Sequence, residues 1–446
     1  MRNLKSCATS AVHAIASKTN AEEKIRRLLG EIFSGCALQN IGIQLWDGTN
    51  WPDDRQRAAV LSLKHPESLG RMFLAGTEVG LAEAYLRDDF DIEGDIAAAF
   101  EIADFLLERL GDWKKKLKLA GLLVGLPNGD GQSMIGRMAQ LLGRNRNQRH
   151  SIERDRKAIR FHYDVSNEFY QLWLDRRMVY SCAYFLSPEE DLEGAQENKL
   201  DYLCRKLRLQ PGQRLLDIGC GWGGLLIYAA RQFGVRAEGI TLSENQADYA
   251  RKRIVDDGLT GKASIELSDY RELGGELERY DAIVSVGMAE HVGRECLADY
   301  FKVAYRLLKP GGVFLNQAIG EGIVPRPDNT SGSFIEQYVF PDGDILPLPV
   351  MLKAAESAGF EIRDVENLRE HYSLTLGHWL HRLERHHRKA VAFADETIYR
   401  TWRLYLAGSK YRFQRGHIAV YQTLLAKLDS SGKNGLPLNR SDWYVH

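Results

Sequence analysis

The stretch LLDIGCGWGG, Leu215 to Gly224, is the strongest indicator of fold class in this chain. A run of apolar residues leads into Asp217, four glycines follow, and the segment LLIYAARQF comes next. This order predicts a buried strand, a tight turn and a helix. Glycine suits such a turn because it adopts dihedral angles that other residues avoid, and because a backbone without Cβ lets a ligand approach closely. On its own, the pattern is typical of any nucleotide-binding α/β domain.

Strand and helix patterns alternate on both sides of this turn. Strands are predicted at 214–219, 236–241, 263–269, 280–287 and 311–320, and helices at 196–207, 224–233, 243–258 and 297–309. Strands separated by helices predict a doubly wound, mostly parallel sheet of the α/β class, whose ligands bind at the carboxyl ends of the strands. That rule brings four segments to one rim, at 217–224, 241–246, 269–270 and 287–291.

The length and composition are those of an ordinary globular protein with two domains or more. The chain has 446 residues, of which 44% are hydrophobic and 27% charged, with a formal net charge of −1. Such a balance gives no overall field that would attract nucleic acid. The six cysteines form no CxxC pair, which favours a reduced, cytoplasmic protein. The longest apolar run, at 119–126, is too short to span a bilayer, and no secretory signal is evident.

The pattern before the glycine turn predicts a smaller α+β domain. We expect an N-terminal accessory, lipid-associated domain at 1–126, a basic linker at 127–158 and the α/β domain at 159–446. From 137 to 160, eight Lys or Arg residues stand against two acids, a local charge of +6. This segment is either a solvated connector or a surface that contacts anionic lipid head groups.

Several further short sequence motifs narrow the function expected of the α/β domain. They are GITLSENQ at 239–246, LSDYREL at 267–273, SVGMAEHVG at 285–293 and LLKPGGVFL at 307–315. Together they resemble the S-adenosylmethionine-dependent methyltransferases, and within them the cyclopropane-fatty-acid synthases. The resemblance implies that the following residues bind S-adenosylmethionine: Tyr180, Ser181, Asp217, Gly219, Gly221, Gly223, Thr241, Ser243, Gln246, Asp269 and Tyr270. In it, Gln246 holds the ribose, Asp269 and Tyr270 frame the adenine, and Tyr180 and Ser181 lie at the methionine end.

Methylation of an unactivated alkene makes a carbocation, which must be shielded from water, stabilised and finally deprotonated. The resemblance implies that bicarbonate, held by a Cys, a Glu, a His, a backbone group and a Tyr, takes the proton. The matching groups are Cys182, Glu290, the backbone of Ile319 and Tyr372, but Gln317 stands at the histidine position. A glutamine amide donates and accepts hydrogen bonds but carries no charge and relays no proton. This difference leaves the product open.

The function implied is conversion of the cis double bond of an unsaturated phospholipid acyl chain into a cyclopropane. The alternative is the same methyl transfer giving a methyl-branched or methylene fatty acid. A non-catalytic lipid-binding protein and a small-molecule methyltransferase are further alternatives. The resemblance implies peripheral association with the inner face of the membrane, and homodimerisation by analogy. The histidines at 378, 381, 386 and 387 lack metal-ligand spacing, so we expect no metal site.

Overall fold

The computed structural model describes residues 25–35, 41–74, 77–111, 165–273, 277–325, 334–340 and 343–444. The chain divides into two units, Met1–Arg144 with Pro327–Phe334, and Asn145–Arg326 with Ile335–His446. The domain boundaries predicted at 126–127 and 158–159 lie outside the described residues, and so does the basic segment 137–160.

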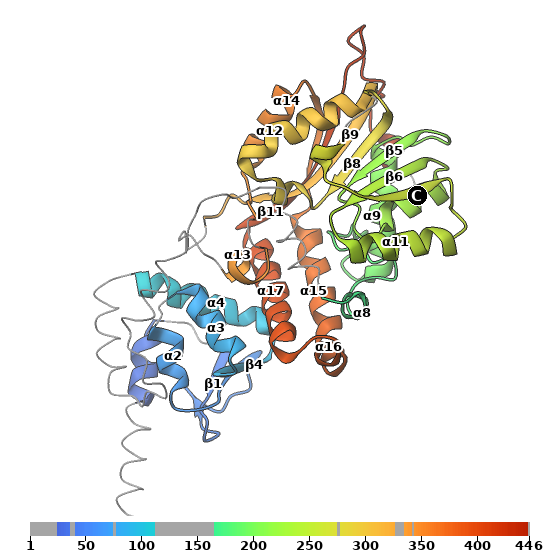
Figure 1. The fold of residues 1–446 in the computed structure, drawn as a ribbon. Coiled ribbons are helices and arrows are strands. Elements are labelled where there is room, and N and C mark those ends of the chain that lie inside the picture. The colour runs from blue at the N-terminus through green and yellow to red at the C-terminus, as the bar shows by residue number, and fades with distance from the viewer. Residues whose placement is uncertain are drawn as a thin grey trace, which may run out of the picture. The chain divides into compact units, whose positions relative to one another are not determined.

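The second unit is built on a seven-stranded sheet in the order β10-β11-β9-β8-β5-β6-β7 (Figure 1). Its strands are β5 (Arg214–Ile218), β6 (Arg236–Thr241), β7 (Ala263–Leu267), β8 (Tyr280–Val286), β9 (Leu308–Glu321), β10 (Glu361–Asn367) and β11 (Ile418–Ala426). The five strands from β9 to β7 pair in parallel. At the other edge, β11 pairs antiparallel with both β9 and β10. The predicted α/β class with a mostly parallel sheet is confirmed.

Helices cover both faces of this sheet (Figure 1). The helices after residue 165 are α8 (Asn167–Gln171), α9 (Leu192–Lys206), α10 (Gly224–Gln232), α11 (Glu244–Asp256), α12 (Ala289–Leu307), α13 (Phe334–Tyr338), α14 (Leu348–Ser357), α15 (Arg369–Arg385), α16 (His387–Phe393) and α17 (Glu396–Arg415), of which α9, α10, α11, α12 and α14 pack on the sheet. Leu315 of β9 packs in a core with α9, α10 and α11. Its neighbour Phe314 packs in a second core with α12 and α14. Successive strand residues point to opposite faces, so one strand supplies both cores.

The strand order places β5 at the centre of the parallel part of the sheet. From β5 the chain proceeds outward through β6 to β7, and then returns to β8 on the other side of β5. The connections that leave β5 and β8 therefore diverge above the carboxyl ends of the strands. In doubly wound sheets this divergence opens the crevice that binds ligands.

The first unit is a small α+β structure, as the sequence predicts. Its sheet has the order β2-β1-β3-β4, in which only β1 and β3 are parallel. The strands are β1 (Ile41–Gln44), β2 (Asn50–Trp51), β3 (Ala59–Leu63) and β4 (Phe90–Gly94), and the helices include α2 (Ser68–Leu74), α3 (Glu78–Leu86) and α4 (Ile96–Gly111).

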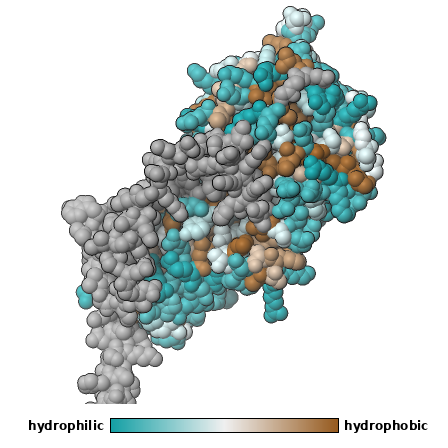
Figure 2. Space-filling model, viewed as in Figure 1, coloured by the Kyte–Doolittle hydropathy of each residue, from teal (hydrophilic) through white to brown (hydrophobic). Residues whose placement is uncertain are grey.

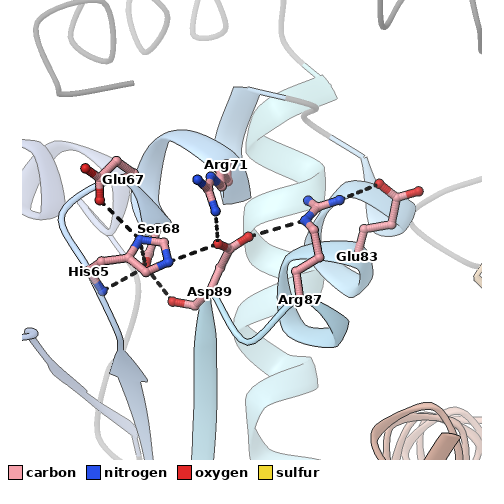
Figure 3. A network of polar contacts seen from close by, with 7 residues as sticks. All are labelled: His65, Glu67, Ser68, Arg71, Glu83, Arg87 and Asp89. Carbon is pink, nitrogen blue, oxygen red and sulfur yellow. Dashed lines mark hydrogen bonds and ion pairs between the residues drawn. The ribbon is translucent and has the colours of Figure 1, made fainter. Parts of the chain in front are cut away.

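A buried carboxylate ties the loops of this unit together (Figure 3). The Asp89 side chain has no exposed surface; its Oδ1 accepts a hydrogen bond from Arg71 Nη1 at 2.8 Å and lies 3.2 Å from His65 Nε2. The Ser68 hydroxyl donates to the Asp89 carbonyl oxygen. Because a buried charge requires such partners, the network joins the start of α2 to the start of β4.

The face shown in Figure 2 is mostly hydrophilic, with hydrophobic residues in small scattered groups. Within the part of the chain that the structure describes, no helix combines the length and the hydropathy needed to cross a bilayer.

Candidate active site

A pocket lies at the carboxyl ends of β5, β6 and β8, where the strand order predicts it. The predicted cofactor residues that line it are Tyr180, Ser181, Asp217, Gly219, Gly221, Thr241, Gln246, Asp269 and Tyr270. Nine of the eleven predicted cofactor residues therefore line the same pocket.

Gly223 and Ser243 do not line the pocket. Gly223 is the left-handed N-cap of α10, and a Cβ there would come within 3.0 Å of Ala250 Cβ. Ser243 caps α11, where its side chain accepts a hydrogen bond from the backbone of Gln246. Both residues are N-caps of helices that support the pocket without lining it. The sequence alone does not distinguish such supporting residues from those that line the pocket.

The glycine turn after β5 leaves its backbone open to the pocket. Gly219 and Gly221 have φ of +83° and +54°, a region that residues with a Cβ rarely adopt. The amides of Gly219 and Cys220 donate to the Ile240 carbonyl oxygen at 3.0 and 2.9 Å, which anchors the turn on β6. A Cβ on Gly221 would meet nothing within 4 Å. A ligand can therefore approach this backbone directly.

The Gln246 side chain is oriented by Thr241, which belongs to the same sequence motif at 239–246. The Thr241 hydroxyl donates to Gln246 Oε1 at 2.8 Å, and its oxygen accepts from the backbone amide of Ser243. With its oxygen held by Thr241, the buried Gln246 directs its amide nitrogen elsewhere. This side chain can present hydrogen-bond donors to a ligand.

Asp269 lines the pocket, but its carboxylate is engaged. Its two oxygens accept from Arg271 Nε and Nη2 at 2.8 and 2.7 Å, and it caps the short helix Tyr270–Glu272. The Tyr270 ring beside it packs edge-on against Tyr300, with 5.4 Å between ring centroids. Asp269 thus helps to fix the short helix that carries Tyr270, a residue that lines the pocket.

A buried acid and a buried lysine lie in the pocket together, and the sequence analysis missed the lysine. Lys199 is 1% exposed, and its Nζ donates to Ser181 Oγ at 2.9 Å. Burial raises the pKa of Asp217 to about 7, an effect that the Lys199 charge opposes. Burial also lowers the pKa of Lys199 to about 8. The signal was present, because Lys199 stands on the apolar face of its helix, four residues before Leu203.

None of the predicted reacting residues is among those that line the pocket, although Cys182 and Glu290 neighbour lining residues in the sequence. Glu290 follows the lining residue Met288 by two positions, in the first turn of α12. Its Oε1 accepts a hydrogen bond from the Ile319 amide at 2.7 Å, so two predicted residues are in direct contact. Its Oε2 is buried and has no hydrogen-bond partner among the described residues. Burial raises the pKa of this carboxyl to about 7.

Cys182 and Tyr372 both contact the Leu368 carbonyl oxygen at the start of α15, the first through its thiol and the second through its backbone amide. The Cys182 thiol is fully buried, with Sγ 3.8 Å from the Leu368 carbonyl oxygen. The same oxygen accepts from the backbone amide of Tyr372 at 3.0 Å. Burial raises the pKa of the Cys182 thiol, so it stays protonated and is a poor nucleophile.

Gln317 lies on β9, beside β8 and β11. Its carbonyl oxygen accepts from the amide of Gly287, a pocket residue, at 2.9 Å. Its side-chain oxygen accepts from Gln422 Nε2 at 3.0 Å.

An aromatic cluster adjoins the pocket, and the sequence analysis did not predict it. The pocket residue Tyr180 packs against Trp173, Trp379 and Trp402, with ring centroids 5.5, 5.2 and 6.0 Å away. Its hydroxyl donates to that of Tyr405 at 3.3 Å. The rings come from α15, α17 and the segment before α9, which are far apart in the sequence.

Metal ligation has no evident centre here. No group of three or more His, Cys, Asp or Glu side chains within the described ranges could hold a metal ion. The histidines at 378–387 also fall on two helices, because α15 ends at Arg385 and α16 begins at His387.

Comparison with known proteins assigns the chain to a family. The family model described as mycolic acid cyclopropane synthetase matches residues 150–423. The chain belongs to this family. A protein from Pseudomonas putida named "Probable fatty acid methyltransferase" is 39% identical over 414 residues, which cover 92% of this chain and 98% of that protein.

Two solved structures of the family resemble the second unit. A cyclopropane synthase from Mycobacterium tuberculosis has 33% identity and a TM-score of 0.58, covering 64% of this chain and 100% of its own. A mycolic acid cyclopropane synthase complexed with S-adenosylhomocysteine and CTAB has 33% identity and a TM-score of 0.57. The match covers 60% of this chain and 97% of that one. This member of the cyclopropane synthetase family is an S-adenosylmethionine-dependent methyltransferase.

The pocket of this methyltransferase fits S-adenosylmethionine. The open Gly221 backbone leaves room for the cofactor, and Gln246 offers donors for the ribose hydroxyls. The cofactor's amino-acid part carries both charges, and the pocket holds both an acid, Asp217, and a base, Lys199.

Replacing Gln246 by Ala is expected to weaken S-adenosylmethionine binding by about 1–3 kcal/mol, because buried hydrogen bonds are lost. Isothermal titration calorimetry measures this. The control is Gln210→Ala, an exposed glutamine outside the pocket. An unchanged affinity in Gln246→Ala would exclude contact with the cofactor.

Proposed function

We propose that this protein methylates the cis double bond of an unsaturated phospholipid acyl chain and closes a cyclopropane ring. One observation carries the proposal: a cluster of aromatic rings and a buried carboxylate, one oxygen of which has no hydrogen-bond partner among the described residues, both adjoin the cofactor pocket. When bound, S-adenosylmethionine supplies an electrophilic methyl group.

The aromatic cluster suits a cationic acyl chain. The faces of Trp and Tyr rings attract positive charge, and they do so most strongly where water is excluded. Trp379 and Trp402 are buried, and both pack against the partly buried ring of Tyr180. Apolar rings also accommodate a hydrocarbon chain. The cluster therefore supports an alkene as the methyl acceptor in preference to a polar small molecule.

Glu290 is the proton acceptor in this proposal. Its Oε1 is fixed by the Ile319 amide, which leaves Oε2 to accept a proton. A pKa of about 7 suits a general base near neutral pH, because about half of the carboxyl groups are then ionised and the ionised form still binds a proton well.

Bicarbonate belongs to the proposal through the family resemblance. The Ile319 amide that would hold it donates to Glu290, and Gln317 Oε1 accepts from Gln422. The site as it stands does not fit the anion, because at least the first of these bonds must open for it to enter. If bicarbonate takes part, turnover rises when it is added to a depleted assay.

The alternative product is a methyl-branched or methylene fatty acid. Two observations favour it: the relative from Pseudomonas putida, matched over nearly its whole length, is named as a fatty acid methyltransferase, and Gln317 replaces the family's histidine. The products all derive from the same first cation. Loss of a proton from the transferred methyl group with ring closure gives the cyclopropane, loss of a chain proton gives a methyl-branched alkene, and a 1,2-hydride shift before loss of a methyl proton gives the methylene product.

Phospholipid substrates require contact with a membrane surface. We include peripheral association with the inner face of the membrane in the proposal, supported by the +6 charge of residues 137–160. A homodimer is part of it by family analogy alone.

Methyl incorporation into vesicles tests the proposal. The full chain is incubated with vesicles of dioleoyl phosphatidylglycerol and S-adenosylmethionine carrying a labelled methyl group. We expect label in the lipid, and none with vesicles of the saturated dipalmitoyl lipid. Equal labelling of both lipids, or labelling of neither, would contradict the proposal.

A further inference from the structure

A row of buried polar side chains crosses three strands next to the reacting residues. Glu366 on β10 lies directly opposite Gln422 on β11, and Gln422 lies directly opposite Gln317 on β9. Residues paired in this way point to the same face of a sheet with their Cβ atoms close together. Lys206, the last residue of α9, reaches this row from that face.

The contacts form a continuous chain. Lys206 Nζ donates to Gln422 Oε1 at 2.9 Å and also to Glu366 Oε2. Gln422 Nε2 donates to Gln317 Oε1 at 3.0 Å. Lys206, Gln422 and Gln317 are each at most 2% exposed. Water is therefore largely excluded from these bonds, which strengthens them and makes an unpaired group costly.

The chemistry of Lys206 sets the direction of every bond in this chain. An ammonium group has only donors, whereas an amide has an acceptor oxygen and a donor nitrogen. Gln422 must therefore turn its oxygen to Lys206 and its nitrogen to Gln317. Gln317 must in turn face Gln422 with its oxygen. The two donors on Gln317 Nε2 are then directed away from Gln422.

Gln317 also belongs to a part of β9 that is hydrogen-bonded both to the cofactor pocket and to the proposed base. Its backbone oxygen accepts from Gly287 of the pocket, and Ile319, two residues further along β9, donates to Glu290. We propose that Lys206 and Gln422 are positioning residues that hold Gln317 as a hydrogen-bond donor to an oxygen acceptor in the reacting site. This inference rests on the proposed function, because the acceptor belongs to the methylation reaction.

The proposal gives Gln317 a definite task. Its amide stays neutral at every pH near physiological, so it cannot remove the proton and leaves that step to Glu290. It can hold one oxygen atom, of a carboxylate or of a small oxyanion, in a fixed place beside the cation. Lys206 thus acts on the reaction through two side chains without touching the substrate.

The decisive variant is Gln422→Glu. The new carboxylate is nearly the same size and still accepts from Lys206, but it has no donor for Gln317. Gln317 then turns its nitrogen toward that carboxylate, and the site loses its donor. We expect kcat to fall about ten-fold, the effect of one hydrogen bond of about 1.4 kcal/mol. The Kd for S-adenosylmethionine, measured by calorimetry, should stay unchanged.

A double-mutant cycle separates positioning from a merely structural role. With Gln317→Leu already present there is no donor to orient, so adding Gln422→Glu should lower kcat no further. Lys206→Met should reproduce the loss and Lys206→Arg, which keeps a donor-only group, should retain activity. Thermal unfolding shows whether Gln422→Glu is folded. If it is not, the two lysine variants test the same inference.

The result that overturns the inference is a wild-type kcat in Gln422→Glu, or the same further loss in the Gln317→Leu background. Activity of the wild-type protein on dioleoyl phosphatidylglycerol vesicles is measured alongside. If the wild type labels no lipid, the proposed function fails; if it labels lipid and the cycle is additive, only this inference fails.

Discussion

Glu290→Gln is expected to lower kcat by about 10³-fold or more, because the variant cannot accept a proton. The substituted amide oxygen still accepts the hydrogen bond from Ile319, so the local geometry is kept. Glu290 does not line the cofactor pocket, and the Kd for S-adenosylmethionine should therefore stay near that of the wild type. Single-turnover transfer of labelled methyl to vesicles measures the rate, and calorimetry measures the binding.

The control is Glu295→Gln, an exposed glutamate on the same helix, which should retain full activity. In the wild type, kcat should rise with pH through about 7, as the buried Glu290 carboxyl loses its proton. A parallel loss of cofactor binding in Glu290→Gln, or turnover close to normal, would refute the role of Glu290 as base.

The same variant should be more stable than the wild type above neutral pH. Burial raises the pKa of folded Glu290 from 4.5 to about 7, so the folded state binds this proton more tightly than the unfolded state. The stability that this group contributes is present below about pH 4.5 and is lost as the pH rises to about 7. At pH 8 the buried, ionised Glu290 lowers the free energy of unfolding by about 3 kcal/mol relative to its contribution below about pH 4.5. Chemical unfolding at pH 5 and pH 8 should show a gain for Glu290→Gln only at the higher pH.

The second large effect is expected from Lys199→Met. Lys199 compensates the buried Asp217 carboxyl and donates to Ser181. Its removal leaves that acid without a nearby positive charge, which we expect to lower the free energy of unfolding by about 3 kcal/mol. Cofactor affinity should fall as well, because Lys199 and Ser181 both line the pocket. Urea unfolding at pH 8 and calorimetry measure the two effects.

Adding Asp217→Asn to Lys199→Met should recover most of the stability, because the uncompensated charge is then gone. The matched control is Lys302→Met, a lysine with 60% of its side chain exposed, which should be neutral. Equal losses in the single and double variants would show that Lys199 acts through packing alone.

The parallel half of the large sheet could be predicted almost residue by residue. The apolar runs before Gly219 and Gly287 end where β5 and β8 end, because buried parallel strands are continuously apolar and glycine begins the turn. The antiparallel edge could not be predicted. Residues 418–426 form β11 between β9 and β10, and no local pattern tells a strand which neighbours it will join.

The site was predictable where its residues follow strands. Thr241 and Gln246 come to the rim because β6 ends there, and the same rule brings Glu290 there after β8. The helix was predicted at 297–309, whereas α12 spans Ala289–Leu307 and is kinked at Gly293, whose φ of +73° and ψ of 158° are not helical. Glu290 lies in the short helical segment before this kink, which the sequence did not predict.

Contacts between distant segments lay beyond the sequence. Lys206 and Gln422 are more than two hundred positions apart, and only the folded sheet places them against Gln317. The same is true of Tyr180, Trp379 and Trp402, which gather from separate segments. Such clusters arise from tertiary packing, which no periodicity encodes.

The structure of the lipid product is the most direct test of ring closure on an acyl double bond. Lipids from a heterologous host that expresses the full chain are analysed by mass spectrometry and proton NMR, beside lipids from a host that expresses Glu290→Gln. The account predicts unsaturated chains heavier by one CH₂ group with high-field cyclopropane protons, and neither signal with the variant. A CH₂ gain with branched-methyl or vinylidene signals would contradict ring closure, and no gain at all would contradict the acyl chain as substrate.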